Sequence, residues 1–308
     1  MQRKSLVETI RADNTSGAAE LTKMAAIAVL EWTEDSASMP LHPWLEELSA
    51  FASGLSKAQP AMAPLFNLAN AILLAVKSTA VQEAPLPYVR RAVQAFLEQL
   101  TQTRERLTRV ALERLPPGAR ILTLSYSSSV LAVLLEAHAR QRLSAVFCLE
   151  SRPMLEGQRL SQALSKAGIA VELGVDAAMV TFAARADMAL VGADSITAGG
   201  VVNKLGTTSL ALACRHAGIP CYVVADGLKW LPAVAPTPAF SQRKAEADVW
   251  ANPPNGVTIW NAYFECTPMM LFSGIVGEDG LRRPEDVLQQ LLTMPIADVL
   301  RDGSSAAD

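Results

Sequence analysis

Short apolar segments alternate with helical segments through the second half of the chain, and this alternation limits the fold more than any other feature. The apolar segments are 119–125, 144–150, 169–175, 187–194 and 219–226. The helices between them are expected at 127–141, 155–168, 176–186 and 202–218. Almost wholly apolar strands that alternate with helices form parallel sheets buried on both faces. The sequence therefore predicts an α/β fold built on a parallel sheet.

The first 115 residues instead follow a helical period. Helices are expected from Ser16 onward, over much of Trp44–Lys57, over 62–78, and from Pro87 to Leu115. Pro116-Pro117-Gly118 then ends the last of these helices. We therefore expect a helical N-terminal domain at 1–115 and a sheet-containing domain at 116–308.

The C-terminal part of the chain is less regular. The stretch 228–258 is rich in Pro and Trp and fits either a long functional loop or an inserted element. A final helix is expected from Pro284 to Leu300, and the tail 303–308 is expected to be disordered.

Composition excludes several function classes. The 308 residues include 27 Lys and Arg against 30 Asp and Glu, for a net charge of −3, so nucleic-acid binding through bulk positive charge is not expected. The four cysteines and three histidines lack metal-ligand spacing, and neither dinucleotide nor P-loop glycine motifs occur, so we expect no metal and no cofactor. Without an apolar run of ~18 residues we expect no membrane partner. The expected location is the cytoplasm.

Ligands of open parallel sheets bind beyond the carboxyl ends of the strands. That rule selects Ser125–Ser129, Glu150–Pro153, Gly174–Asp176, Gly192–Asp194 and Ala225–Gly227. In the first of these, a serine-rich turn opens a helix, which favours a phosphate. The alternative is that Ser127 or Ser128 only caps that helix.

Arg152 follows a strand end and suits bidentate contact with a phosphate or carboxylate. The alternative is a surface salt bridge with Glu150 or Glu156. Asp194 ends an apolar run, where burial raises a carboxyl pKa, so it is either a general acid or base, or a helix cap or a partner of Lys204. Asn203 and Lys204 are expected at the start of a helix, where Lys204 either meets an anion or Asp194, or is simply solvated.

The segment GADSITAGGVVNKLGT, followed by GIPCYVVAD, resembles a signature of one superfamily. That superfamily joins methylthioribose-1-phosphate isomerase, ribose-1,5-bisphosphate isomerase and the alpha, beta and delta subunits of eukaryotic translation initiation factor two-B. Similar segments occur in the same order in ILTLSYSSSVL, ESRPMLEGQRL, NAYFECTP, GIVGEDGLRRP and DNTSGAAEL. The resemblance spans most of the chain and is weakest between Glu34 and Leu115. It implies an N-terminal helical domain, a Rossmann-like (NagB/RpiA/CoA-transferase-like) domain and a homodimer.

The resemblance also implies which residues act. The family's isomerases convert a furanose 1-phosphate to an open-chain ketose 1-phosphate with a cysteine after the first strand and the aspartate of Gly-Ala-Asp. Here the aspartate is Asp194, while Ser125 occupies the cysteine position. The residues implied to contact a phosphorylated substrate are Gly17, Ala18, Ser127, Ser128, Arg152, Asn203 and Lys204.

Two departures from the isomerases shape the expected function. A serine hydroxyl is a far poorer proton donor and base than a thiol near neutral pH. Ser16 precedes Gly17-Ala18 where the isomerases carry an arginine, and Tyr126 is more similar to the translation-factor subunits. We therefore expect a sugar-phosphate-binding or nucleotide-binding, oligomerising protein that lacks full isomerase catalysis. The alternatives are an active aldose-ketose isomerase with Asp194 as acid and base, and a scaffold with a vestigial pocket.

Overall fold

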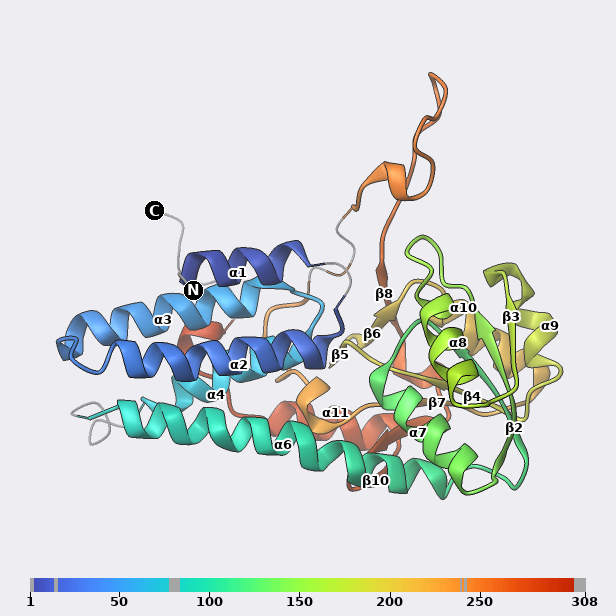
Figure 1. Ribbon diagram of the computed structural model, residues 1–308, viewed down its shortest axis with the longest axis horizontal. Coiled ribbons are helices and arrows are strands. Elements are labelled where there is room, and N and C mark those ends of the chain that lie inside the picture. The colour runs from blue at the N-terminus through green and yellow to red at the C-terminus, as the bar shows by residue number, and fades with distance from the viewer. Residues whose placement is uncertain (1–2, 14–15, 78–83, 239, 241–242, 302–308) are drawn as a thin grey trace.

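The computed structural model describes residues 3–13, 16–77, 84–238, 240 and 243–301 (Figure 1). Its N-terminal part is a bundle of helices, drawn in blue to cyan. The helices are α1 (Arg3–Ala12), α2 (Ala18–Asp35), α3 (Leu41–Ala58), α4 (Ala63–Ala75) and α6 (Leu86–Leu112). The last four confirm the predicted helices, whereas α1 is not predicted from the sequence. Within the described ranges, no helix has both the length and the apolar character needed to cross a lipid bilayer.

Aromatic side chains fill part of the bundle core. The rings of Trp32 and Trp44 stack with centroids 5.1 Å apart, and Phe51 packs edge-on against Trp32. Gln59 Nε2 donates hydrogen bonds to the carbonyl oxygens of Ile10 at 2.9 Å and Asp13 at 2.8 Å. These bonds attach the end of α1 to the end of α3, so α1 is part of the bundle.

The main sheet has seven strands in the order β10-β9-β7-β4-β1-β2-β3. Their bounds are β1 (Ala119–Leu124), β2 (Leu143–Leu149), β3 (Val171–Gly174), β4 (Met188–Val191), β7 (Cys221–Val224), β9 (Gly274–Gly277) and β10 (Gly280–Arg282). From β9 to β3 every neighbouring pair is parallel, and the β9–β10 hairpin is antiparallel. This arrangement confirms the predicted α/β fold with a mostly parallel sheet.

Helices cover both faces of the sheet, as the apolar strands predict. Ile121 of β1 packs in a cluster with α7 (Ser128–Ala139), α8 (Glu156–Lys166) and the C-terminal end of α6. Its neighbour Leu122 packs on the opposite face with α9 (Met179–Ala183), α10 (Thr207–Ala217) and α11 (Pro284–Thr293). Successive side chains of a strand point to opposite faces, so an apolar strand supplies two cores.

A second, antiparallel sheet corrects one prediction. It contains β5 (Ser195–Thr197), β6 (Gly200–Lys204) and β8 (Phe264–Thr267). Asn203 and Lys204 therefore end a strand, and the helix predicted from residue 202 begins only at Thr207. Strand β6 starts at Gly200, which has a φ of 145°. Strand β8 packs so close to this residue that an added Cβ would lie 2.4 Å from the Thr267 carbonyl oxygen. The strand pairing with β8 overrides the helical period.

The C-terminal part contains two further departures from regular structure. Among the described residues of 228–258, the short turns η2 (Gly227–Lys229) and η3 (Glu246–Asp248) are the elements of regular structure, and residues 243–258 project as an arm in Figure 1. The last helix ends at Thr293 and not at Leu300, because Pro295 disfavours helical backbone at the residue before it. The predicted disordered tail lies outside the described residues.

The helical and sheet-containing parts are joined by packing along α6 and by hydrogen bonds. Helix α6 contributes its N-terminal half, including Val93, to the bundle core and its C-terminal half, including Leu107, to the core beneath the sheet. Asn70 of α4 donates to the carbonyl of Pro295 at 3.0 Å and accepts from the N–H of Ala297 at 2.8 Å. The junction between these parts holds the candidate site.

Candidate functional site

A cavity of 680 Å³ lies between the helical bundle and the carboxyl ends of β1 and β4. It is lined by most of the residues that the sequence selects: Gly17, Ala18, Ser125, Tyr126, Ser127, Ser128, Asp194 and Asn203. A hollow of similar size, 710 Å³, lies between α1, α2 and α3, but none of these residues lines it. The cavity between the two parts is therefore the candidate site.

The serine-rich turn reaches the cavity through a strained backbone. Ser125 follows β1 with φ of 63°, and its N–H donates to Ser151 Oγ at 2.7 Å. Ser127 Oγ accepts from the Val130 N–H at 3.3 Å, so Ser127 caps α7 as one reading of the sequence expects. Gly192 passes so close that an added Cβ would lie 2.5 Å from Ser127 Oγ. Strand β4 and the turn therefore fix each other.

Two helix N-termini meet at this cavity. Gly17 is the N-cap of α2 and provides no side-chain cap, and Ser127 is the N-cap of α7. Both residues line the cavity. The N-terminal end of a helix carries partial positive charge and unpaired N–H groups, which favour an anion.

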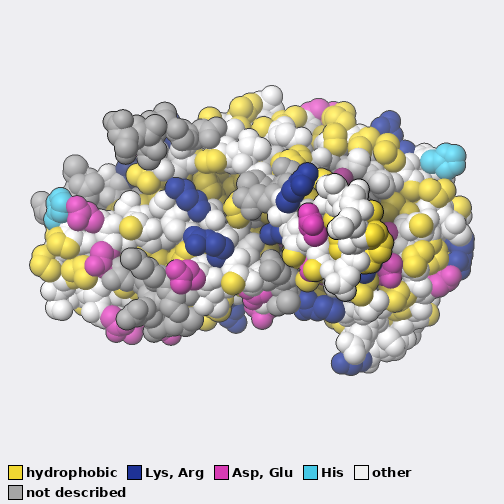
Figure 2. Space-filling model, turned by 90° about the horizontal axis from the view of Figure 1, so that it is seen from above, with side chains coloured by type: hydrophobic (Ala, Val, Ile, Leu, Met, Phe, Trp, Pro, Cys, Tyr) yellow, Lys and Arg dark blue, Asp and Glu magenta, His cyan; other side chains and the backbone are white. Residues whose placement is uncertain are grey.

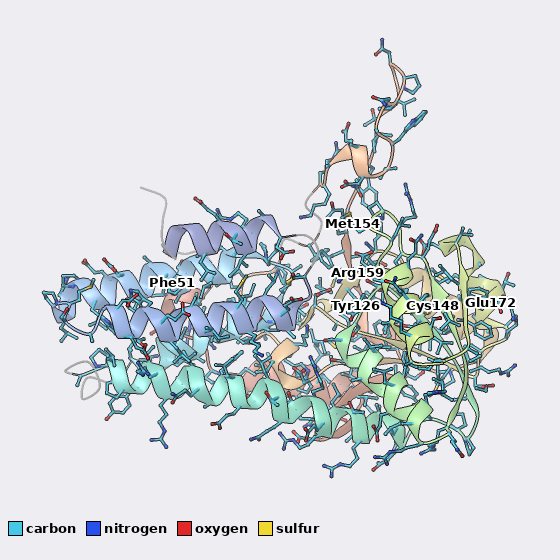
Figure 3. All side chains as sticks on the ribbon, in the orientation of Figure 1. Phe51, Tyr126, Cys148, Met154, Arg159 and Glu172 are labelled. Atoms are coloured by element: carbon cyan, nitrogen blue, oxygen red, sulfur yellow. The ribbon has the colours of Figure 1, made fainter. Side chains whose placement is uncertain are left out.

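Four basic side chains add to this positive field. Lys23 of α2, Arg104 of α6, Arg159 of α8 and Lys229 of η2 all line the cavity, against the carboxylates of Glu20, Glu105 and Asp194. Figure 2 shows Lys and Arg side chains in the middle of the upper face, between the helical and sheet-containing parts. Figure 3 shows Arg159 close to Tyr126, and its guanidinium carbon lies 5.1 Å from the centre of that ring. No pattern in the sequence selects these four residues.

Asp194 lies deep in the cavity wall and keeps a partly accessible surface. Burial raises the pKa of its carboxyl above the ordinary value of 3.8, an effect that Lys229 opposes most strongly. Glu156 raises this pKa further, while Lys204 lowers it. A carboxyl of this kind can hold a proton closer to neutral pH, which suits a general acid or base.

Asn203 and Lys204 have different places. Asn203 lines the cavity, and its Nδ2 donates to Thr207 Oγ1 at 3.0 Å. Lys204 is not among the lining residues, since its side chain is only 2% exposed and its Nζ lies 2.7 Å from Glu156 Oε1. Lys204 therefore pairs with Glu156 and not with Asp194, although its charge still acts on Asp194.

Arg152 is exposed and does not line the cavity. Its Nη2 donates to the carbonyl oxygen of Val249, at the base of the arm, at 3.1 Å. The Asp176 carboxylate accepts the N–H groups of both Ser151 and Arg152, at 2.8 and 2.7 Å, and fixes this turn. The surface salt bridge with Glu150 or Glu156 is not formed within the part of the chain described here. Of Asp194, Lys204 and Arg152, only Asp194 lines the cavity; Lys204 lies behind its wall, paired with Glu156, and Arg152 lies apart.

Among the described residues, neither a thiol nor a cluster of metal-binding side chains lines the cavity. Cys148, Cys214 and Cys221 are buried, Cys266 is half-buried, and none lines the cavity. Burial raises the pKa of Cys148 to about 11, so it is inert as a nucleophile. No group of three or more His, Cys, Asp or Glu side chains among the described residues could hold a metal ion.

The sequence feature that could have identified these basic residues differs between Lys229 and Arg104. Lys229 lies three residues beyond Asp226, at the carboxyl end of β7, so the strand-end rule that selects Asp226 could have reached it. Arg104 lies on a helix that precedes the sheet in the chain. Only the packing of α6 across the junction shows that Arg104 lines the site.

Known proteins resemble this chain over nearly its whole length. It is 30% identical over 286 residues to the ribose 1,5-bisphosphate isomerase of Archaeoglobus fulgidus, covering 90% of this chain and 88% of the other. It is 31% identical over 296 residues to the methylthioribose-1-phosphate isomerase of Gemmatimonas aurantiaca, covering 92% and 86%. The crystal structure of translation initiation factor eIF-2B from Pyrococcus horikoshii OT3 superposes with a TM-score of 0.79 at 29% identity, covering 93% of this chain and 98% of that one. The model of the Initiation factor 2 subunit family matches residues 6–284. The chain therefore belongs to the Initiation factor 2 subunit family.

Proposed function

We propose that the protein binds a phosphorylated sugar or nucleotide in the cavity at the junction and works by oligomerisation, without full isomerase catalysis. The proposed ligand contacts are Gly17, Ala18, Ser127, Ser128 and Asn203, which line the cavity, with Lys204 acting from behind its wall. We further propose that it forms a homodimer in the cytoplasm.

One observation carries the ligand class. The N-terminal ends of α2 and α7 and the side chains of Lys23, Arg104, Arg159 and Lys229 converge on a single cavity. In a chain of net charge −3, this is a local excess of positive field at a hollow large enough for a small molecule. Phosphate is an anion that both helix N-termini and guanidinium groups bind.

The chemistry of Ser125 argues against full catalysis. Ser125 lines the cavity at the position that resembles the catalytic cysteine of the family's isomerases, and no cysteine replaces it there. Losing one proton-transfer group costs about 10²–10⁴-fold in rate. A ligand can therefore bind in this cavity while its isomerisation remains slow.

Asp194 favours a second candidate function, aldose-ketose isomerisation. Its carboxyl can hold a proton because burial raises its pKa. Such a group could protonate the ring oxygen of a furanose 1-phosphate and then move hydrogen between C2 and C1, with water in place of the thiol. This candidate requires Asp194 to be essential for turnover.

Two measurements test these functions. Calorimetric titration with ribose 1,5-bisphosphate, methylthioribose 1-phosphate and a nucleoside monophosphate should give saturable binding of at least one ligand. Lys229→Ala should weaken that binding about tenfold, because a charge-assisted contact is lost, while Lys166→Ala, an exposed lysine outside the cavity, should not. Binding of none of the three would contradict the proposal. A coupled isomerase assay on wild type and Asp194→Asn tests the second candidate, which fails if both have the same rate.

A further inference from the structure

Asn67 of α4 holds the turn that carries Lys229. Its Nδ2 donates to the carbonyl oxygens of Leu228 and Trp230, both at 2.8 Å. These residues flank Lys229, so one amide group from the helical bundle fixes the turn on both sides of it. We propose that Asn67 is a positioning residue that sets where the Lys229 ammonium lies in the cavity. The inference deepens the proposed function, on which it rests, because it concerns the same site.

The other hydrogen bonds that hold this turn come from the sheet-containing part, while the Leu228 and Leu231 side chains pack into the bundle core. Asp226 Oδ1 accepts from the Leu228 N–H at 3.0 Å, and Glu278 Oε2 accepts from the Gly227 N–H at 3.1 Å. The Leu231 N–H donates to the Ile196 carbonyl at 2.9 Å. These bonds anchor N–H groups, whereas Asn67 supplies donors to the carbonyl groups that flank Lys229.

Burial makes the contribution of Asn67 hard to replace. Leu228 and Trp230 are 5% and 3% exposed, so their carbonyl groups have little access to water. A buried carbonyl that loses its donor pays a desolvation penalty, and the backbone shifts to recover a partner. Because Lys229 lies between these two carbonyls, such a shift displaces its side chain.

The position of Lys229 matters for Asp194. The charged groups that act on Asp194 are Lys229 on η2, Lys204 on β6 and Glu156 on α8, and the last two are paired with each other. Lys229 lowers the pKa of Asp194 more than Lys204 does, and with Arg104 it also lowers that of Asp226. Moving the ammonium away should therefore raise the pKa of Asp194.

Asn70, nearly one turn further along α4, is a matched control. It also joins the bundle to the C-terminal part, through the Pro295 carbonyl and the Ala297 N–H. It is 7% exposed and makes neither of the contacts that Asn67 makes with the Lys229 turn. Substituting Asn70 removes hydrogen bonds between the same two parts without releasing Lys229.

The experiment uses the full chain with Asn67→Ala, Asn67→Gln, Asn70→Ala, Lys229→Ala and the double variant Asn67→Ala/Lys229→Ala. Carbon-13 NMR of labelled aspartate carboxyls gives the pKa of Asp194 without ligand, assigned by the signal missing in Asp194→Asn. Calorimetry gives the affinity for ribose 1,5-bisphosphate. Asn67→Ala and Lys229→Ala should each raise the pKa of Asp194 and weaken binding about tenfold. Asn67→Gln should retain part of the wild-type Asp194 pKa and part of the wild-type affinity. Asn70→Ala should change neither the pKa nor the affinity.

The double variant separates positioning from general destabilisation. If Asn67 acts through Lys229, its loss adds nothing once Lys229 is alanine. The inference is overturned if Asn67→Ala moves the Asp194 pKa no more than Asn70→Ala does, or if its effect persists undiminished in the double variant. If the pKa responses hold but wild type does not bind the bisphosphate, the positioning role stands and ribose 1,5-bisphosphate is excluded as the ligand of the proposed function.

Discussion

Lys204 and Glu156 form an ion pair behind the candidate site, with Nζ 2.7 Å from Oε1 and only 2% of the lysine side chain exposed. The Tyr263 ring lies against the same ammonium, 5.5 Å from its centre. A buried ammonium depends on its partner, because the unpaired charge has lost its water. The pair therefore has two roles: it compensates the buried lysine within the fold, and it balances the charges acting on Asp194.

Glu156→Gln should cost about 3 kcal/mol of unfolding free energy, since it leaves the Lys204 charge unpaired. It should also lower the pKa of Asp194, because Glu156 raises it. Urea denaturation measures the first effect. Glu136→Gln, which breaks the exposed Arg140–Glu136 pair, should cost no more than about 0.5 kcal/mol. Equal losses in the two variants would show that the buried pair does not stabilise the fold.

Gly192→Ala should destabilise the protein by about 1–3 kcal/mol, because the added Cβ would lie 2.5 Å from Ser127 Oγ and displace the serine-rich turn. Ligand affinity should fall with it. Gly54→Ala is the control, since that Cβ would make ordinary contact with Val7 at 3.5 Å inside α3. It should raise stability by about 0.5–1 kcal/mol through helix propensity. A neutral Gly192→Ala would mean that β4 does not fix the turn.

Asp194→Asn should change the pH dependence of stability. The folded pKa of Asp194 lies above its ordinary value of 3.8, so the wild type is favoured while this carboxyl is protonated and loses stability as pH rises from 3.8 through the folded pKa. The side-chain amide of the Asp194→Asn variant does not ionise, so the variant does not lose this stability. Asp194→Asn should therefore gain stability over wild type as pH rises and match it below pH 3.8.

Asp187→Asn provides the opposite sign. Arg120 lowers the pKa of Asp187 below its ordinary value of 3.8. The Asp187 carboxylate therefore stabilises the fold at pH values above 3.8, and this stabilisation is lost as the pH falls through the lowered pKa. Urea unfolding between pH 3 and pH 8 compares the two variants. A pH-independent difference between Asp194→Asn and wild type would contradict the raised pKa.

Ser125→Cys should raise isomerase activity by about 100-fold or more, because it supplies a thiol that transfers protons near neutral pH. The rate at which ribose 1,5-bisphosphate is converted to the ketose 1,5-bisphosphate measures it. Ser129→Cys adds a thiol to the same cavity at another position and should have no effect. Adding Asp194→Asn to Ser125→Cys should abolish the gain. No gain would mean that the cavity lacks more than the thiol.

The strands and most helices follow from local patterns that the sequence displays. The apolar segments at β1, β2, β4 and β7 predict a buried parallel sheet because each must supply two cores, as Ile121 and Leu122 do. Strand β6 does not follow from its own sequence. It is fixed by pairing with β8, which is some sixty residues away in the chain, so a local period cannot show it.

Strand ends predict one part of the candidate site, and the family resemblance implies Gly17 and Ala18 as well. Asp194 and the serine-rich turn come directly after β4 and β1, whereas Arg104 reaches the cavity through the packing of α6. Arg152 also follows a strand end, yet Asp176 fixes its turn and the guanidinium contacts the arm. Strand order and local sequence say which residues are near an edge, but not which way a long side chain points.

A crystal structure of the protein with ribose 1,5-bisphosphate would test the central claim most directly. We predict a phosphate group bound between the N-terminal ends of α2 and α7, within contact distance of Ser127 and Lys229. A phosphate bound elsewhere, with this cavity occupied only by water at saturating ligand, would contradict the account.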